Sequence, residues 1–375
     1  MKEEGFRVET DTLGEVKVRA DAYWGAQTQR AIENFPISGW KIPIPVIRAI
    51  AAIKWAAAKA NAELGLIPGE FLKPIQQACL EIWEGKLNEH FPIDVFQTGS
   101  GTSTNMNVNE VIATRANEII TGKKNTKHPI HPNDIVNKCQ SSNDVIPSAI
   151  MVATVIEVKS SLLPSLKALE QSLLKKSEEF KDIVKIGRTH LMDATPITLG
   201  QEFSGYAYQV KNAMEMLSEL KRQRMLALGG TAVGTGINAH PLFAQKAIKY
   251  LNELTGEDFY ESPNHFFSQA TIDTLCEFSG RLQTFATSLF KIANDLRWLS
   301  SGPKCGVGEI TLPSLQPGSS IMPGKINPVI PEAVMMVCCF VMGLHTTIAI
   351  AAQNGNFELN TMLPVSAYSI INEIQ

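Results

Sequence analysis

The chain has 375 residues, 44% of them hydrophobic and 19% charged, and a formal net charge of −3. This is the composition of an ordinary globular protein that is long enough for two or three domains. Lysine and arginine are scattered, which argues against a nucleic-acid partner, and no uninterrupted run of about 18 apolar residues predicts a membrane span. The six cysteines show no C-x-x-C spacing. They indicate a reduced protein, and we expect a cytoplasmic location.

The first part of the chain predicts a short hairpin followed by helices. Residues 6–20 alternate in polarity around a turn at Leu13-Gly14-Glu15, as a small β-hairpin would. Helices are expected near residues 44–64 and 69–86. We therefore expect residues 1–138 to form a mainly helical N-terminal domain with a short β-hairpin, and residues 139–375 to form a second domain.

The second part of the chain carries apolar residues at alternating spacings of three and four. These seams cover residues 162–173, 203–220, 275–299 and 334–348, and they predict long helices packed nearly parallel in a bundle. The helix expected at 331–350 is apolar nearly all round, so it must be covered on every side. Either subunits associate through this helix or it is buried inside one large monomeric core.

Polar segments interrupt the apolar pattern, and the first of them lies before a helix expected near Val108. This segment, Gln97–Asn107, contains Ser100 and Thr102. Backbone N–H groups and hydroxyls at a helix N-terminus form an anion-binding site. Serine, threonine and asparagine also cap helices without binding anything, and both interpretations stay open at this point.

Two further polar segments precede helical seams. In His131–Asp144, the residues Ser141–Asn143 open the helix that carries the 162–173 seam. In Gly187–Pro196, Thr189 and His190 lie in a polar turn before the 203–220 seam. A histidine in such a turn is either functional or a hydrogen-bonded structural residue.

The segment Gly318–Pro328 is the most distinctive in the chain. It places small, backbone-donating residues beside Lys325 and Asn327, with a proline at its end. A mobile loop of this kind can carry a hydroxyl group, here that of Ser319, and close over an anion. A phosphate-binding P-loop is excluded because five residues separate the glycines and Ile326 follows the lysine.

Several common chemistries find no motif in this sequence. The seven histidines include no H-E-x-x-H and no Cys/His cluster at ligand spacing, so we expect no metal. Residues 228–238 are rich in glycine but lack the strand context of a dinucleotide loop, and we interpret them as a tight connection between helices. No G-x-S-x-G elbow is present, which disfavours α/β-hydrolase chemistry.

Taken together, these polar segments resemble the conserved regions of class II fumarases in the fumarase/aspartase superfamily, and the similarity runs over nearly the whole chain from Tyr23. Residues 98–102, 141–144 and 191–196 lean toward fumarase, whereas 328–332 look more aspartase-like. The resemblance implies a mainly α fold with a long central helical bundle and a smaller N-terminal helical domain. It also implies a homotetramer whose active sites are each shared by three subunits. Family members have a small C-terminal domain that this sequence lacks, so we expect it to be truncated.

The resemblance further implies a reaction: the reversible trans hydration of fumarate to L-malate in the tricarboxylic acid cycle, through an aci-carboxylate carbanion and without a cofactor. Ser319 would be the general base, and Lys325 and Asn327 would bind the carboxylate next to the carbanion. His190 would pair with Glu332 and handle the leaving hydroxyl through water. Alternatively, Glu332 serves only as a favourable charge at a helix N-terminus.

Other residues would hold the remaining substrate oxygens: Ser100, Thr102, Ser141, Ser142, Asn143 and Thr189. His131, Asn133 and Asp134 match the family's second carboxylate site, although Ile135 replaces the histidine usual there. An aspartate ammonia-lyase is the nearest alternative function. A non-catalytic structural relative is another, but retention of the base, the lysine and the histidine argues against it.

Overall fold

The computed structural model describes residues 5–375, which form two compact units. Unit 1 contains the chain up to Glu157 together with Leu220–Cys276 and Thr347–Ile371. Unit 2 contains Val158–Glu219, Glu277–Thr346 and Asn372–Gln375. This grouping reflects compactness and does not test the boundary predicted between residues 138 and 139, which stays a prediction.

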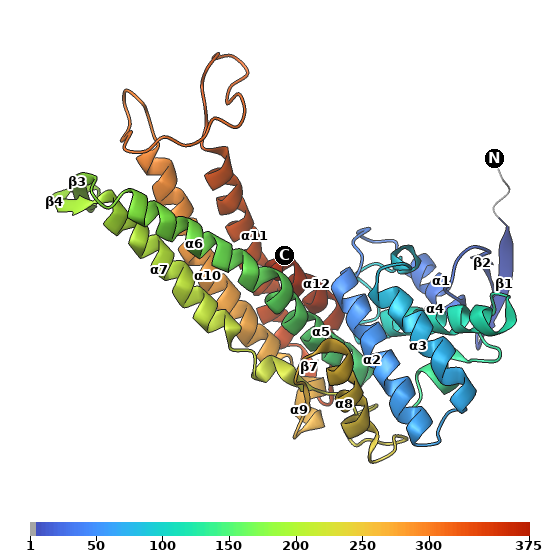
Figure 1. Cartoon of the computed structure of the whole chain (residues 1–375). Helices are drawn as coiled ribbons and strands as arrows, with labels where there is room; N and C mark the ends of the chain where they lie inside the picture. The colour runs from blue at the N-terminus through green and yellow to red at the C-terminus, as the bar shows by residue number, and fades with distance from the viewer. Residues whose placement is uncertain (1–4) are drawn as a thin grey trace. The chain divides into compact units, whose positions relative to one another are not determined.

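Unit 1 begins with the antiparallel hairpin of β1 (Phe6–Asp11) and β2 (Gly14–Arg19), which confirms the hairpin predicted from alternation (Figure 1). The helices that start in this unit are α1 (Ala26–Asn34), α2 (Ile44–Glu63), α3 (Gly69–Trp83), α4 (Thr102–Thr121), α5 (Ser142–Glu157), α8 (Phe243–Thr255), α9 (His265–Ala270), α10 (Asp273–Leu299) and α12 (Leu363–Ile374). Short strand pairs join β5 (Met225–Leu226) to β6 (Tyr260–Glu261) and β7 (Gly355–Asn356) to β8 (Leu359–Asn360).

Helix α2 forms the centre of unit 1. It begins after Pro43 and contacts α3, α5 and α8, so its alanine and isoleucine side chains are buried around most of its circumference. This explains why the predicted helix is so rich in both residues. Helix α3 ends at Trp83, three residues before the predicted end. Gly85 follows with φ +82°, a left-handed conformation that suits glycine at a helix C-terminus.

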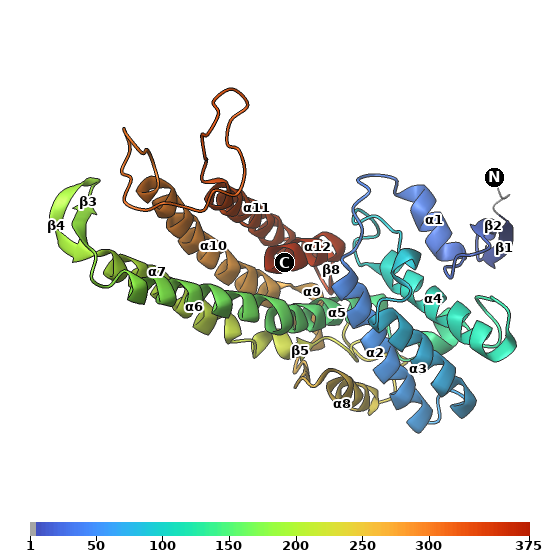
Figure 2. The ribbon, with the colours of Figure 1, turned by 45° about the horizontal axis from the view of Figure 1, so that its top comes forward.

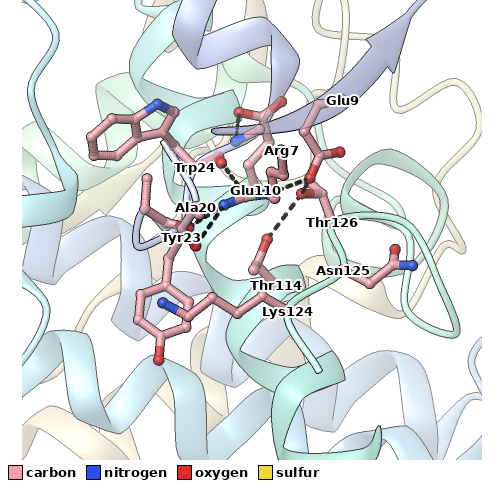
Figure 3. Close-up of polar contacts among 12 residues, drawn as sticks. Arg7, Glu9, Ala20, Tyr23, Trp24, Glu110, Thr114, Lys124, Asn125 and Thr126 are labelled. Atoms are coloured by element: carbon pink, nitrogen blue, oxygen red, sulfur yellow. Dashed lines mark hydrogen bonds and ion pairs between the residues drawn. The ribbon is translucent and has the colours of Figure 1, made fainter. Parts of the chain in front are cut away.

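A polar cluster attaches the N-terminal hairpin to the rest of unit 1 (Figure 3). Arg7 donates to the carbonyl oxygen of Trp24 at 2.5 Å, and its guanidinium pairs with Glu9 at 2.8 Å. The Glu9 carboxylate also accepts from the Thr126 hydroxyl at 2.8 Å. The hairpin is therefore held by side chains whose partners lie far away in the sequence.

Glu110 of α4 lies in the same region and organises the start of α1 (Figure 3). Its carboxylate accepts from the backbone N–H groups of Gly25 (2.8 Å), Gln27 (2.9 Å) and Thr28 (3.1 Å). Helix α1 has no side-chain cap of its own, so a distant carboxylate satisfies its first N–H groups. Burial raises the pKa of Glu110 even though these donors oppose the shift.

Unit 2 is built around long helices, as predicted from the seams. Helices α6 (Leu163–Glu179) and α7 (Leu199–Ser218) run side by side and are connected by the antiparallel hairpin of β3 (Val184–Thr189) and β4 (Met192–Thr198) (Figures 1 and 2). Most of α10 and of α11 (Val329–Ala352) also belongs to this unit. Ala286 of α10 packs in a buried cluster with Cys338 and Val341 of α11.

The helix predicted to open at Ser141–Asn143 and to carry the 162–173 seam is continuous from Ser142 to Glu179. Within this helix, a π-helical turn at Val158–Leu162 joins α5 to α6. Pro164 lies in the first turn of α6 and has no N–H to donate to a preceding carbonyl. The missing donor explains why the hydrogen-bond pattern widens locally to a π-helical turn.

Helix α11 exposes apolar side chains within the single chain. Met336, Val337, Phe340 and Ile350 are 67%, 59%, 54% and 58% exposed. By length and composition alone, this helix and the stretch Ser142–Glu179 could each cross a membrane. That is weak evidence, because core helices of soluble proteins meet the same criterion.

Candidate active site

The loop Gly318–Pro328 is folded back on itself by backbone and side-chain hydrogen bonds. The N–H of Gly318 donates to the carbonyl of Lys325 at 2.8 Å, and the Asn327 side-chain amide donates to the carbonyl of Gly318 at 2.5 Å. A Cβ on Gly318 would lie 2.7 Å from both the Asn327 nitrogen and the Lys325 oxygen. Only glycine permits this approach, which brings three predicted site residues, Ser319, Lys325 and Asn327, into one small loop.

The Ser319 hydroxyl has a specific environment in this loop. Its oxygen accepts from two consecutive backbone N–H groups, those of Ile321 (3.3 Å) and Met322 (3.1 Å). The same donors would stabilise negative charge on this oxygen if the hydroxyl lost its proton. The side chain is half-buried, and the neighbouring Lys325 is exposed.

His190 and Thr189 lie on the β3–β4 hairpin, where the sequence had predicted only a polar turn. Thr189 pairs with Met192, so His190 and Leu191 form a two-residue turn in which both have positive φ, 57° and 61°. Turns of this type normally use asparagine and glycine, and a bulky residue in this region costs on the order of 1–3 kcal/mol. Backbone strain of this kind is concentrated at functional sites.

Glu332 lies in the first turn of α11, as the capping interpretation requires. Among the described residues, no hydrogen bond or ion pair joins it to His190. The predicted pairing of these two side chains therefore stays a proposal.

In unit 1, the structure brings two predicted binding segments together. The hydroxyls of Ser100 and Thr102 are 2.8 Å apart at the N-terminus of α4. One turn further along α4, Asn105 donates to the hydroxyl of Ser142 at 3.0 Å, which joins this helix to the start of α5. Asn143 donates to the carbonyl of Ala232 at 2.8 Å.

Sequence analysis missed the buried charges beneath these segments. Lys54 of α2 is fully buried and donates to the Asn137 side-chain oxygen at 2.7 Å, which also accepts from Asn105 at 3.2 Å. Burial lowers the pKa of Lys54 to about 7. The position of this lysine in the middle of an alanine- and isoleucine-rich helix was a sequence signal that could have revealed the buried charge.

Asp144 is the second buried charge, and it fixes the Ser141–Asn143 segment from below. Its carboxylate accepts from the N–H groups of Ser141 (2.9 Å), Gly229 (3.0 Å) and Thr231 (3.0 Å). Burial raises the pKa of Asp144, although these donors oppose the shift. The glycine-rich stretch predicted to be a tight connection therefore contacts the start of α5.

The second predicted carboxylate site forms a single π-helical turn, Pro132–Val136. The His131 Nδ1 atom accepts from the N–H groups of Asn133 and Asp134, both at 3.3 Å. His131 and Asn133 line an open cavity of about 760 Å³, together with Lys127 and Arg30. The three residues are brought together, but their role in binding stays a prediction.

Within residues 5–375, no group of three or more His, Cys, Asp or Glu side chains is placed to hold a metal ion.

The helical architecture and the loop that carries the Ser319 hydroxyl can be compared with those of known protein families. Residues 14–343 match the protein family described as Lyase, so the chain belongs to this family. The chain is 53% identical over 367 residues to the class II fumarate hydratase of Xylella fastidiosa, an alignment covering 98% of this chain and 76% of that protein. It is 49% identical to the class II fumarate hydratase of Bacillus subtilis, covering 99% of this chain and 80% of that one. The crystal structure of the class II fumarase of Schistosoma mansoni superposes with a TM-score of 0.96 at 41% identity, covering 99% and 81% of the two chains. Within the lyases, the chain belongs to the class II fumarate hydratase family, which confirms the resemblance and the fold class predicted from the sequence.

Proposed function

We propose that this chain is a fumarate hydratase that reversibly adds water, in trans, across the double bond of fumarate to give L-malate in the tricarboxylic acid cycle. The observation that carries the proposal is the Ser319 hydroxyl oxygen, which accepts from two consecutive N–H groups in a loop that also holds Lys325 and Asn327. Family membership supports the same reaction, because the relatives named above are fumarate hydratases.

The chemical difficulty lies in removing a proton from the carbon beside a carboxylate. Negative charge then accumulates on that carboxylate as an aci-carboxylate dianion, and a preorganised positive charge and hydrogen-bond donors should provide the largest catalytic contribution. Lys325 and Asn327 are the proposed groups. Ser319 is the proposed general base, with its alkoxide stabilised by the N–H groups of Ile321 and Met322.

His190 would handle the leaving hydroxyl through a water molecule. Glu332 would pair with His190 and fix the orientation of its ring. The remaining substrate oxygens would be held by Ser100, Thr102, Ser141, Ser142, Asn143 and Thr189. His131, Asn133 and Asp134 would form a second carboxylate site. The substrate is neither oxidised nor reduced in this reaction, so the proposal includes no cofactor.

We also propose a homotetramer in which three subunits contribute to each active site. Burying the apolar side chains that α11 exposes in the single chain would favour such an association. A cytoplasmic location and a division into domains at residues 138 and 139 complete the proposal.

The test measures ultraviolet absorbance of the fumarate double bond after L-malate or L-aspartate is added separately. Absorbance should rise with malate alone; a rise with aspartate alone would move the assignment to aspartate ammonia-lyase. Ser319→Ala should lower turnover by at least about 10²-fold and leave assembly, measured by size-exclusion chromatography, intact. The neighbouring exposed Ser320→Ala is the matched control, and wild-type turnover in Ser319→Ala would refute the assignment of the base.

A further inference from the structure

The hairpin that carries Thr189 and His190 has little to hold it in place by burial. Val184, Leu191 and Met192 are 74%, 75% and 70% exposed. The strained turn at residues 190 and 191 also lowers the stability of the hairpin. Because a two-stranded hairpin is marginally stable on its own, other contacts must fix its position.

Ion pairs along strand β3 supply such contacts. The Lys185 ammonium lies 2.6 Å from a carboxylate oxygen of Glu202 and 2.7 Å from one of Glu309. The Arg188 guanidinium pairs with the other oxygen of Glu309 at 2.6 Å. One carboxylate thus binds two residues of strand β3, and Arg188 immediately precedes Thr189 and His190.

The environment keeps Glu309 charged. Burial raises the pKa of its carboxyl, but Arg188 and Lys185 outweigh this effect, and the pKa lies below its ordinary value. The Lys185 side chain is only 7% exposed. Water therefore screens its ion pairs less than it screens pairs on the open surface.

The backbone of Glu309 is fixed as well. Its N–H donates to the carbonyl of Leu299, at the end of α10, at 2.8 Å. The preceding Gly308 donates to the carbonyl of Ser301 at 2.8 Å. The carboxylate that binds strand β3 is therefore anchored at the end of α10.

We propose that Glu309 is a positioning residue: its carboxylate clamps strand β3 and so fixes the position of the His190 turn. This inference rests on the proposed function for its effect on turnover. The clamp itself does not depend on that function and can be measured separately.

The first measurement is hydrogen–deuterium exchange of the hairpin amides, residues 184–198, in Glu309→Gln. This substitution keeps the size of the side chain and removes its charge. We expect exchange in the hairpin to rise at least about tenfold, with exchange in the buried part of α7 unchanged. The matched control is Glu179→Gln, which removes the carboxylate of an exposed pair with Lys176 on α6 and should leave the hairpin unchanged. Unchanged hairpin exchange in Glu309→Gln would overturn the proposal.

The second measurement tests the link to His190. Glu309→Gln should lower kcat by about tenfold or more with a smaller change in KM, because a displaced group acts mainly in the transition state. In a His190→Asn background the same substitution should cause no further loss. Losses that multiply would show that Glu309 does not act through His190. An inactive wild type would refute the proposed reaction, whereas the exchange result would still decide whether Glu309 clamps the hairpin.

Discussion

Removing the carboxylate of Glu110 should unfold the start of α1. Three backbone N–H groups depend on this carboxylate, and two of them, those of Gly25 and Thr28, belong to buried residues. The third, on Gln27, belongs to an exposed residue and can bind water instead. In Glu110→Ala two buried donors therefore lose this acceptor.

The magnitude follows from these contacts. A buried donor without a partner costs about 1–3 kcal/mol, so Glu110→Ala should lose about 2–6 kcal/mol of stability. Glu110→Gln keeps one oxygen, which can still accept from Gly25 and Thr28, but turns an amide N–H₂ group toward the N–H of Gln27. We expect that variant to lose about 1–3 kcal/mol.

Urea unfolding of the wild type and the two variants, together with hydrogen exchange of the α1 amides, would measure these losses. The control is Glu33→Gln, an exposed residue of α1 that accepts from Gln29 and should change stability by less than about 0.5 kcal/mol. If Glu110→Gln and Glu33→Gln unfold at the same urea concentration, the carboxylate does not cap α1 and the reasoning fails.

Two further predictions concern the loop and the end of the chain. Gly318→Ala should lower turnover by about 10²-fold without a matching loss of thermal stability, because its Cβ would collide with the backbone of Lys325 and Asn327. The control is Gly205→Ala, where a Cβ meets no atom within 4 Å. Equal turnover in both variants would contradict the prediction. Burial raises the pKa of Glu373 from 4.5 to about 8, although Ser279 donates to its carboxylate at 2.8 Å. The folded chain thus favours the protonated form, so the stability from this group is present below pH 4.5 and is lost as pH rises to about 8. Glu373→Gln should remove this decline in stability, which is worth a few kcal/mol at about 1.4 kcal/mol per pKa unit, while the exposed Glu358→Gln should not. Melting temperatures at pH 5 and pH 9 would measure the decline. The same change in melting temperature for Glu373→Gln and wild type would refute the prediction.

The sequence alone determined the long bundle helices, two helices of the N-terminal part, the N-terminal hairpin and the family. Seams spaced three and four residues apart are local patterns, and they placed the bundle helices within a few residues of their observed bounds. The loop Gly318–Pro328 could be recognised because its glycines, prolines and lysine are adjacent in the chain. Each of these features depends on neighbours in the sequence, which is why it can be read without a structure.

Only the tertiary structure showed what holds the candidate site in place. Glu110 accepts from Gly25, 85 positions away, and Glu309 accepts from Arg188, 121 positions away. The charge of Lys54 and the strained turn at His190 likewise depend on burial and strand pairing. The energy of a buried carboxylate or ammonium is set by the groups that packing brings to it, and no local pattern of residues contains that information.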